Sequence, residues 1–567
     1  MQRSGNGVAL KDMRERDGGE GCSFNDWSHD HTVTVKTLAP RETSWRELAV
    51  VALGLAIVTR AFLFLTDGGA LFTRPLWTDE LHTTLLAGRA TPWAIISDLA
   101  NGADYGPPLL HFGAWMLRVA AGSLSPILLR VTSLLCVWGA LLLVYAVLRR
   151  HFERAASVAG IVAVASHSLV VAHSFEGRFY GPWLLCAAFF AWSLSLPAGR
   201  RRSITLAIAA VCLATIHWYG IVSLGIMVAA AVLSYGRRWR EGLRAVAPAA
   251  AGLAALVACL PLVMGQRHAL TVNTWVPEFS LAQLDSLSRI YWTAMLPVLA
   301  AVLFIARALY AARRNNEEVV AGAFVAPLRD PGVVALMALA LMPLALAAMS
   351  LLGQPSMWPR YALPAVLAWA PFVALVLESL GRWATRAFIA IAVVVWFTNF
   401  TREAQYKRNF AVGVQRQQLA LAQAASLRVP VVFQSMHAMY SAASADWNHR
   451  TETSFLELPD STMEAVFPRG GRFDALNKAL RVERDVARVH SRRFGFPRLT
   501  SQASLDTTSR FVLVASDENL PPGYSGVEGI AVAVFPHHRL ARLGPGLLLF
   551  DRTGAATPAA AVNGRQR

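Results

Sequence analysis

Residues 47–66 read ELAVVALGLAIVTRAFLFLT and are almost wholly apolar. Residues 74–86, RPLWTDELHTTLL, follow soon after and place two adjacent acids, Asp79 and Glu80, just behind Trp77. A run of about 20 apolar residues is long enough to cross a bilayer as a helix. The chain is therefore predicted to leave a membrane near residue 66 and to present two carboxylates at that surface.

The composition extends this prediction to the whole chain of 567 residues. Hydrophobic residues make up 55% of it and charged residues only 16%, and its mean hydropathy is +0.41. Soluble domains carry roughly 25% charged residues. The net charge is +17, but the arginines fall mainly in short loops between apolar runs, as membrane topology requires. We therefore predict membrane lipids, and no nucleic acid, as surroundings of the chain.

Further apolar runs predict about eleven transmembrane helices, so the expected fold class is a mainly α, polytopic membrane protein. The helices are expected near residues 47–66, 126–148, 155–174, 180–197, 203–217, 219–235, 245–264, 289–311, 332–352, 361–380 and 385–401. If they alternate in direction, the arginine clusters between them all lie on one side, which is cytoplasmic by the positive-inside rule. Residues 1–46, which are polar and mixed in charge, are then expected to form a disordered cytoplasmic tail.

The loop 67–125 lies on the opposite, outer side. Pro107 and Pro108 introduce a segment in which apolar residues recur at helical spacing. Proline suits the first turn of a helix, and an amphipathic helix of this kind lies in the plane of the membrane interface. An extra spanning helix here would break the alternation of the basic loops, so we favour the interfacial helix.

Residues 403–567 also fall on the outer side, and their composition differs from that of the membrane part. They are polar, with a helical pattern over 411–427. Short β-rich runs follow, namely VPVVF, RFVLVAS, GIAVAVF and GLLLFDR. This pattern predicts a small α/β extracytoplasmic domain that acts as a lid or docking domain, because it contains no phosphate-binding glycine loop and no nucleophile motif.

The outer side collects most of the candidate site residues. They are Asp79, Glu80, His82, Asp104, His111, His173, Glu176, Arg178, Tyr180, Arg360 and Tyr361. Charged side chains near a bilayer are costly unless they are paired or functional. Carboxylates, imidazoles and guanidiniums together suit a reaction in which a phosphate group leaves, because cations stabilise the departing anion.

Four stretches carry a resemblance to a known family. They are PLWTDELHT, DYGPPLLHFGAWMLRVAAG, SFEGRFYGPWLL and PRYALPAVLAW. In this order they resemble the GT-C superfamily of membrane glycosyltransferases, in particular the branch of the dolichyl-phosphate-mannose protein mannosyltransferases and the bacterial lipid-A sugar transferases. The resemblance covers roughly residues 45 to 400. It departs from the family at His111, where relatives often carry tyrosine.

The resemblance implies a GT-C-like transmembrane glycosyltransferase domain over 47–402, with 67–125 as its first external catalytic loop. Members of the family transfer a sugar from a polyprenyl-phosphate carrier to an acceptor hydroxyl on the outer membrane face. Here the acceptor would be a glycolipid, a glycan or a protein. The arginine-rich, lysine-poor composition favours a bacterial source, which would place the chain in the bacterial inner membrane.

By its match to the family's acidic motif, Asp79 is expected to be the general base, and Glu80 to orient or bind the acceptor. A helix cap or an exposed loop acid is the alternative for Asp79. Arg178 and Arg360 are candidates for holding the donor phosphate, since the guanidinium fork suits phosphate oxygens; snorkelling to the interface is their alternative. For Asp104, acceptor contact and turn chemistry stay open.

A divalent ion is a further expectation. Asp79 and His82 are three residues apart, as are His173 and Glu176, so each pair could share a helical face. Together they could bind Mg or Mn that bridges the donor phosphate, although chance pairing is the simpler interpretation. Trp275 and Pro277 are expected, by analogy with the family, in a loop that covers the donor.

Two other classes of protein compete with the transferase. A transporter or flippase would place polar groups near the bilayer midplane, at broken helices in related halves of the chain. Here the acids lie at the outer boundary, and no convincing internal repeat is found. A sensor or assembly scaffold that used the C-terminal domain would leave the acidic loop without a purpose.

Overall fold

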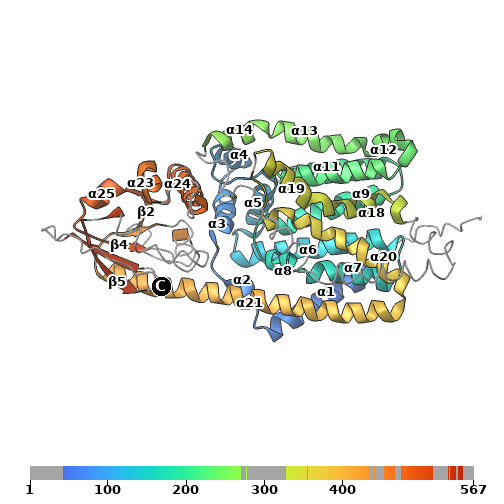
Figure 1. Ribbon diagram of the computed structural model, residues 1–567, viewed down its shortest axis with the longest axis horizontal. Coiled ribbons are helices and arrows are strands. Elements are labelled where there is room, and N and C mark those ends of the chain that lie inside the picture. Colours follow the sequence, from blue (N-terminus) through green and yellow to red (C-terminus); the bar gives the residue numbers. More distant parts are fainter. Residues whose placement is uncertain are drawn as a thin grey trace, which may run out of the picture. The chain divides into compact units, whose positions relative to one another are not determined.

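The computed structural model describes residues 43–269, 276, 327–353, 355–434, 439–440, 453–466, 474–514, 534–535, 537–544 and 547–552. Most of these residues are helical, and a small sheet lies in the C-terminal part (Figure 1). The structure thus confirms a mainly α chain with a small α/β C-terminal region. Trp275, Pro277 and the helix expected over 289–311 lie outside the described residues.

The helices before residue 270 include one long apolar helix followed by four short ones in the first loop. They are α1 (Trp45–Leu65), α2 (Ala70–Thr73), α3 (Thr78–Ala87), α4 (Pro92–Ala100), α5 (Leu109–Ala121), α6 (Pro126–Arg149), α7 (Arg154–Ser166), α8 (Ser168–Ser174), α9 (Tyr180–Ser195), α10 (Arg200–Ile216), α11 (Gly220–Leu233), α12 (Trp239–Val246), α13 (Ala250–Ala258) and α14 (Leu260–Ala269). After residue 326 come α18 (Pro331–Ala338), α19 (Met342–Leu351), the 3-10 helix η5 (Pro359–Ala368), α20 (Trp369–Leu380), α21 (Arg382–Ser426), α23 (Asp460–Val466), α24 (Asp474–Phe494) and α25 (Gln502–Asp506).

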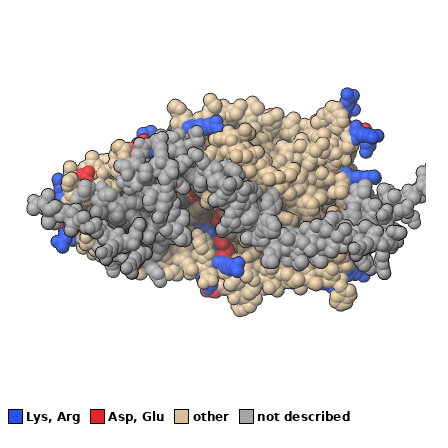
Figure 2. All heavy atoms as spheres, in the orientation of Figure 1, with Lys and Arg blue, Asp and Glu red and all other residues tan. Residues whose placement is uncertain are grey.

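Six stretches of helix in the described part of the chain are long and apolar enough to cross a membrane, and a seventh span results if α7 and α8 count as one. This confirms a multi-pass membrane protein. Figure 2 shows an uncharged surface over α11 and α13, with arginine side chains beginning at the α12 end. Such a band is what a bilayer requires, because its hydrocarbon core does not solvate charge.

Three of the expected helices are present as α9, α10 and α11, but each is shorter than a full span. Helices α9, α10 and α11 contain 16, 17 and 14 residues, whereas about 20 residues are needed for a hydrocarbon core of about 30 Å. The expected helix 155–174 is also interrupted, because α7 and α8 meet at a bend of 68°. The side chain of His167 accepts a hydrogen bond from the Leu169 amide there and caps α8.

Helix α21 differs most from expectation, since it continues for 45 residues through the position where the C-terminal domain was expected to begin. The helical pattern over 411–427 is the last part of this same helix. Residues 382–412 contain neither glycine nor proline, so nothing in the sequence interrupts the hydrogen-bond ladder there. One continuous helix therefore joins the membrane part to the C-terminal domain.

Among the described residues, the C-terminal sheet has six strands, β1 (Val431–Phe433), β2 (Thr453–Glu457), β3 (Leu499–Ser501), β4 (Arg510–Val514), β5 (Arg539–Gly544) and β6 (Leu547–Asp551). Their order is β3-β2-β1-β4-β6-β5, parallel from β3 to β4 and antiparallel from β4 to β5. Successive residues of β1 point to opposite faces, so Phe433 packs in one core with α24, and Val432 in the other with Phe511. The run GIAVAVF lies mostly outside the described residues.

Candidate functional site

Helix α3 positions the two adjacent acids of the loop 67–125. Both lie in its first turn, where the positive end of the helix dipole favours carboxylates. Adjacent helical residues point about 100° apart, so the two side chains diverge. The side chain of Glu80 is completely buried, whereas that of Asp79 is 25% exposed. Of the two acids in the motif, Glu80 is thus part of the packed interior and Asp79 is accessible to other molecules.

Glu80 holds together three segments that are distant in sequence. Its carboxylate accepts hydrogen bonds from Arg130 at 2.6 and 3.0 Å, from Arg74 at 3.0 Å and from the Gly177 amide at 2.9 Å. Burial alone would raise the pKa of Glu80, but the charges of Arg74 and Arg130 hold it below its ordinary value. Glu80 therefore anchors α3 to α6 and to the turn before α9.

Arg178 and Asp104 form the second buried ion pair. The Arg178 guanidinium donates to the Asp104 carboxylate at 2.6 Å, to the Asp79 carbonyl at 2.9 Å and to the Thr83 hydroxyl at 3.1 Å. Burial works against ionisation of Asp104, but the Arg178 charge keeps its pKa well below the usual range. This pair holds the backbone of Asp79 in place through the hydrogen bond from Arg178 to the Asp79 carbonyl.

Two histidines flank the Asp104 carboxylate. The His111 Nε2 atom lies 3.4 Å from one carboxylate oxygen, and the His82 Nδ1 atom lies 3.8 Å from the other. Burial, aided by the Arg178 charge, lowers the pKa of His111 to about 4. His111 is therefore neutral at pH 7, while Asp104 is ionised.

Glu176 forms the third pair. It accepts hydrogen bonds from Lys407 of α21 at 3.1 Å and lies 2.8 Å from the Nδ1 atom of His173. Burial would raise the pKa of Glu176, but the nearby charge of Lys407 keeps it well below the ordinary value. Because Gly177 and Arg178 follow directly, the three residues 176–178 connect all three ion-pair networks.

Two charged side chains next to these networks, Asp79 and Arg360, are partly exposed. Asp79 Oδ2 is 3.9 Å from the Nη1 atom of Arg360, whose side chain is 17% exposed. The rings of Trp77, Tyr180 and Tyr361 surround this guanidinium, with centroids 5.9, 6.0 and 5.8 Å from its central carbon. A carboxylate and a cation thus face each other between aromatic walls.

Several polar atoms here are buried without a hydrogen-bond partner among the described residues. They are the Tyr180 hydroxyl, the Nε2 atom of His82 and the Nδ1 atom of His111. Unpaired buried polar atoms cost about 1–3 kcal/mol each. Native proteins tolerate that cost mainly where a ligand or water completes the bonding.

The two histidines expected to share a metal ion belong to different networks, His82 to that of Asp104 and His173 to that of Glu176. In the part of the chain that the structure describes, no three histidine, cysteine or acidic side chains are grouped as ion ligands. The pairing of Asp79 with His82 and of His173 with Glu176 around one ion is thus not the arrangement seen.

Sequence reasoning missed Arg74, Arg130 and Lys407. Arg130 lies inside the apolar run PILLRVTSLL, and a lone charge at such a position is a signal that could have identified it. Lys407 lies beyond the expected last span and gave no such signal. The partners of Arg130 and Lys407 are 50 and 231 residues away in sequence.

No family model matches the chain, and no curated protein sequence matches it. Among solved structures the chain is similar to ArnT from Cupriavidus metallidurans, whose crystal structure was determined bound to undecaprenyl phosphate. The two share 12% sequence identity, over 90% of this chain and 99% of that chain, with a TM-score of 0.49. This identity is too low to assign a role to any side chain.

Proposed function

We propose that the chain is an integral-membrane glycosyltransferase that moves a sugar from a polyprenyl-phosphate donor to an acceptor hydroxyl on the outer face of the membrane. The observation that carries the proposal is the open pair of Asp79 and Arg360, which stands between aromatic rings in front of three buried ion-pair networks. The four sequence motifs that resemble GT-C enzymes supply these residues.

In this proposal Asp79 is the general base. Its carboxylate takes the proton of the acceptor hydroxyl as the oxygen attacks the anomeric carbon, which is general-base catalysis. The bond from the anomeric carbon to the phosphate oxygen breaks, and the electron pair leaves with the phosphate. Attack from the side opposite the leaving group inverts the configuration at the anomeric carbon.

Arg360 receives the phosphate. Its side chain is partly exposed and 3.9 Å from Asp79, and a guanidinium stabilises the charge that develops on the leaving oxygens. The buried hydroxyl of Tyr180 lies in the same aromatic group and would donate to a donor oxygen. Tyr361 would provide the wall against which the donor rests.

Glu80, Asp104, Glu176 and Arg178 are positioning residues in the proposal rather than substrate contacts. Each is at most 7% exposed in its side chain and already has charged partners. Arg178 holds the Asp79 carbonyl at 2.9 Å, so it fixes the base instead of holding the phosphate. His82, His111 and His173 would support the same networks.

The test is sugar transfer in membranes that contain the full chain, supplied with radiolabelled polyprenyl-phosphate sugars. Asp79→Asn is expected to lower transfer by a factor of about 10²–10⁴, because amides do not accept the proton. Asp67→Asn is the matched control, since Asp67 lies in the same loop with a 90% exposed side chain and a left-handed φ of 49° that asparagine tolerates.

Loss of transfer in Asp79→Asn alone would support the proposal. Equal transfer by the wild type and Asp79→Asn would show that Asp79 is not the general base. An inactive wild type with hexose and pentose donors alike would favour the transporter or flippase instead.

A further inference from the structure

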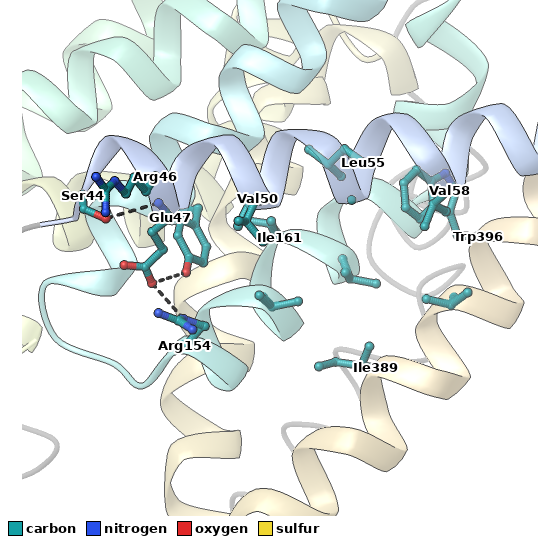
Figure 3. Close-up of a pocket in the computed structure, with 16 residues that line it drawn as sticks. Ser44, Arg46, Glu47, Val50, Leu55, Val58, Arg154, Ile161, Ile389 and Trp396 are labelled. Carbon is teal, nitrogen blue, oxygen red and sulfur yellow. Dashed lines mark hydrogen bonds and ion pairs between the residues drawn. The ribbon is translucent and has the colours of Figure 1, made fainter.

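A groove of about 520 Å³ lies between α1, α7 and α21. Figure 3 shows its walls, with Leu55 and Val58 from α1, Ile161 from α7, and Ile389 and Trp396 from α21. Both α1 and α21 belong to the apolar spans. The groove is therefore located at membrane depth, where its walls are open to acyl chains rather than to water.

One end of the groove is polar. The Glu47 carboxylate accepts hydrogen bonds from the Tyr145 hydroxyl at 2.6 Å, from Arg149 at 2.7 Å and from Arg154 at 3.2 Å. Figure 3 draws the bond to Arg154. Arg46 is exposed beside it. Arg46, Arg149, Arg154 and the Glu47 carboxylate together carry a net charge of +2. The neighbouring Glu153 does not change this balance, because it pairs with Arg382 at 3.9 Å.

We infer that this groove binds an anionic phospholipid of the surrounding bilayer, with one acyl chain between α1 and α21 and the phosphate at Arg46 and Arg154. Lipid tails are as apolar as the side chains that line this groove, so an acyl chain matches its walls. The positive charge at the polar end of the groove favours a negatively charged headgroup. Basic clusters next to membrane helices on the cytoplasmic side attract anionic lipids. The side chain of Arg154 is 72% exposed and bonded to Glu47 through one nitrogen, so donors remain for phosphate oxygens.

This site is distinct from the proposed transferase site and does not depend on it. Helix α1 has 21 residues, which separates its two ends by about 30 Å at 1.5 Å per residue. The groove's polar end is at the start of α1, whereas Asp79 follows the end of that helix.

The experiment measures lipid retention on the purified full chain by native mass spectrometry after incubation with phosphatidylglycerol, phosphatidylcholine or undecaprenyl phosphate in mixed micelles. We expect the wild type to retain phosphatidylglycerol in preference to phosphatidylcholine. Arg46→Gln and Arg154→Gln should each weaken that preference about fivefold, the effect of one basic residue near a lipid surface. Arg238→Gln is the charge control, because Arg238 pairs only with the exposed Glu241 among described residues, at 3.5 Å.

A second pair of variants tests the apolar part of the site without altering charge. Gly54 lines the groove, and a Cβ added there meets no atom within 4 Å. Gly54→Leu should therefore fill the groove and reduce retention of every lipid severalfold. Gly225→Leu, at an equally open helical glycine outside the groove, controls for the change in helix propensity.

Three outcomes would overturn the inference. They are equal retention of phosphatidylglycerol and phosphatidylcholine, retention by Gly54→Leu equal to that of Gly225→Leu, and a preference for undecaprenyl phosphate that the arginine variants abolish. The last would assign the groove to the donor lipid.

Discussion

The two ends of the helical bundle both bury carboxylates, but they differ in the exposure and pairing of the polar groups beside them. At the end where α1 begins, Asp330 caps α18 through the amides of Gly332 and Val333 and accepts a bond from the Ser195 hydroxyl. At the end where α3 begins, Glu80 and Asp104 are equally well paired. Only there, however, does a partly exposed carboxylate stand 3.9 Å from a guanidinium beside an unpartnered tyrosine hydroxyl, within the part of the chain that the structure describes.

This contrast distinguishes charged groups that stabilise the fold from charged groups that are available to a bound molecule. An ion pair that closes a helix end or joins two helices is complete when its partners are in place. A site for a reacting molecule keeps groups that the fold itself does not satisfy. Variants at the two ends should accordingly change stability at both, but catalysis at only one.

The largest effect is expected for Glu80→Gln. It removes the charge of the carboxylate that pairs with the buried Arg74 and Arg130, and breaking a buried pair in this way costs about 3–5 kcal/mol. Thermal unfolding of the purified chain in detergent should show a large decrease in Tm. The control Glu241→Gln should change stability by less than about 0.5 kcal/mol, because that pair is exposed. A Glu80→Gln protein with wild-type Tm would refute the anchoring role.

At the opposite end, Asp330→Ala is expected to cost about 2 kcal/mol. It removes a helix cap and leaves the buried Ser195 hydroxyl without its partner at 2.7 Å. It also removes the contacts with His151 at 2.9 Å and Arg150 at 3.7 Å, which are partly exposed and add little. Unfolding in detergent measures the loss. Transfer per folded molecule should stay at the wild-type level, because this end takes no part in the reaction. Reduced transfer with unchanged Tm would contradict the division between the two ends.

The contrast between the ends was only partly accessible from the sequence. Residues 126–149 were predictable as a helix, because an apolar run follows a Ser125–Pro126 start in which the serine side chain caps the Leu128 amide. Because adjacent residues of a helix do not share a face, the divergence of the Asp79 and Glu80 side chains could also be predicted. The partners of Glu80 were not predictable, since sequence spacing does not tell which side chains meet across 50 residues.

Tyr180→Phe is expected to have a smaller effect, at the end of the bundle where α3 begins. The hydroxyl has no hydrogen-bond partner among the described residues, so its loss should leave stability within about 0.5 kcal/mol. Loss of one hydrogen bond to the donor should lower transfer about tenfold, from about 1.4 kcal/mol. Tyr145→Phe is the matched variant at the other end. It should lower Tm, because its hydroxyl bonds Glu47 at 2.6 Å, and leave transfer unchanged.

The smallest expected effect is a pH dependence of stability that arises from His111. Its pKa is about 4 in the fold, because burial and the Arg178 charge disfavour protonation, and about 6.5 when unfolded. Below pH 6.5 the unfolded chain therefore takes up a proton that the folded chain does not. Stability from this group is complete above that pH and decreases as the pH falls towards 4.

Between pH 8 and pH 6 the loss amounts to about 1 kcal/mol. It should appear as a larger decrease in Tm for the wild type than for His111→Gln, whose amide does not titrate. His490 lies in the same titration window, since burial lowers its pKa to about 3, but it is present in both proteins and cancels in the comparison. Asp104 also cancels, because its carboxylate is ionised throughout this range in both states. If the two proteins lose equal stability over this range, His111 is not held neutral beside Asp104. Its ring would then not be one of the buried polar groups that the fold leaves without a partner among the described residues at this end.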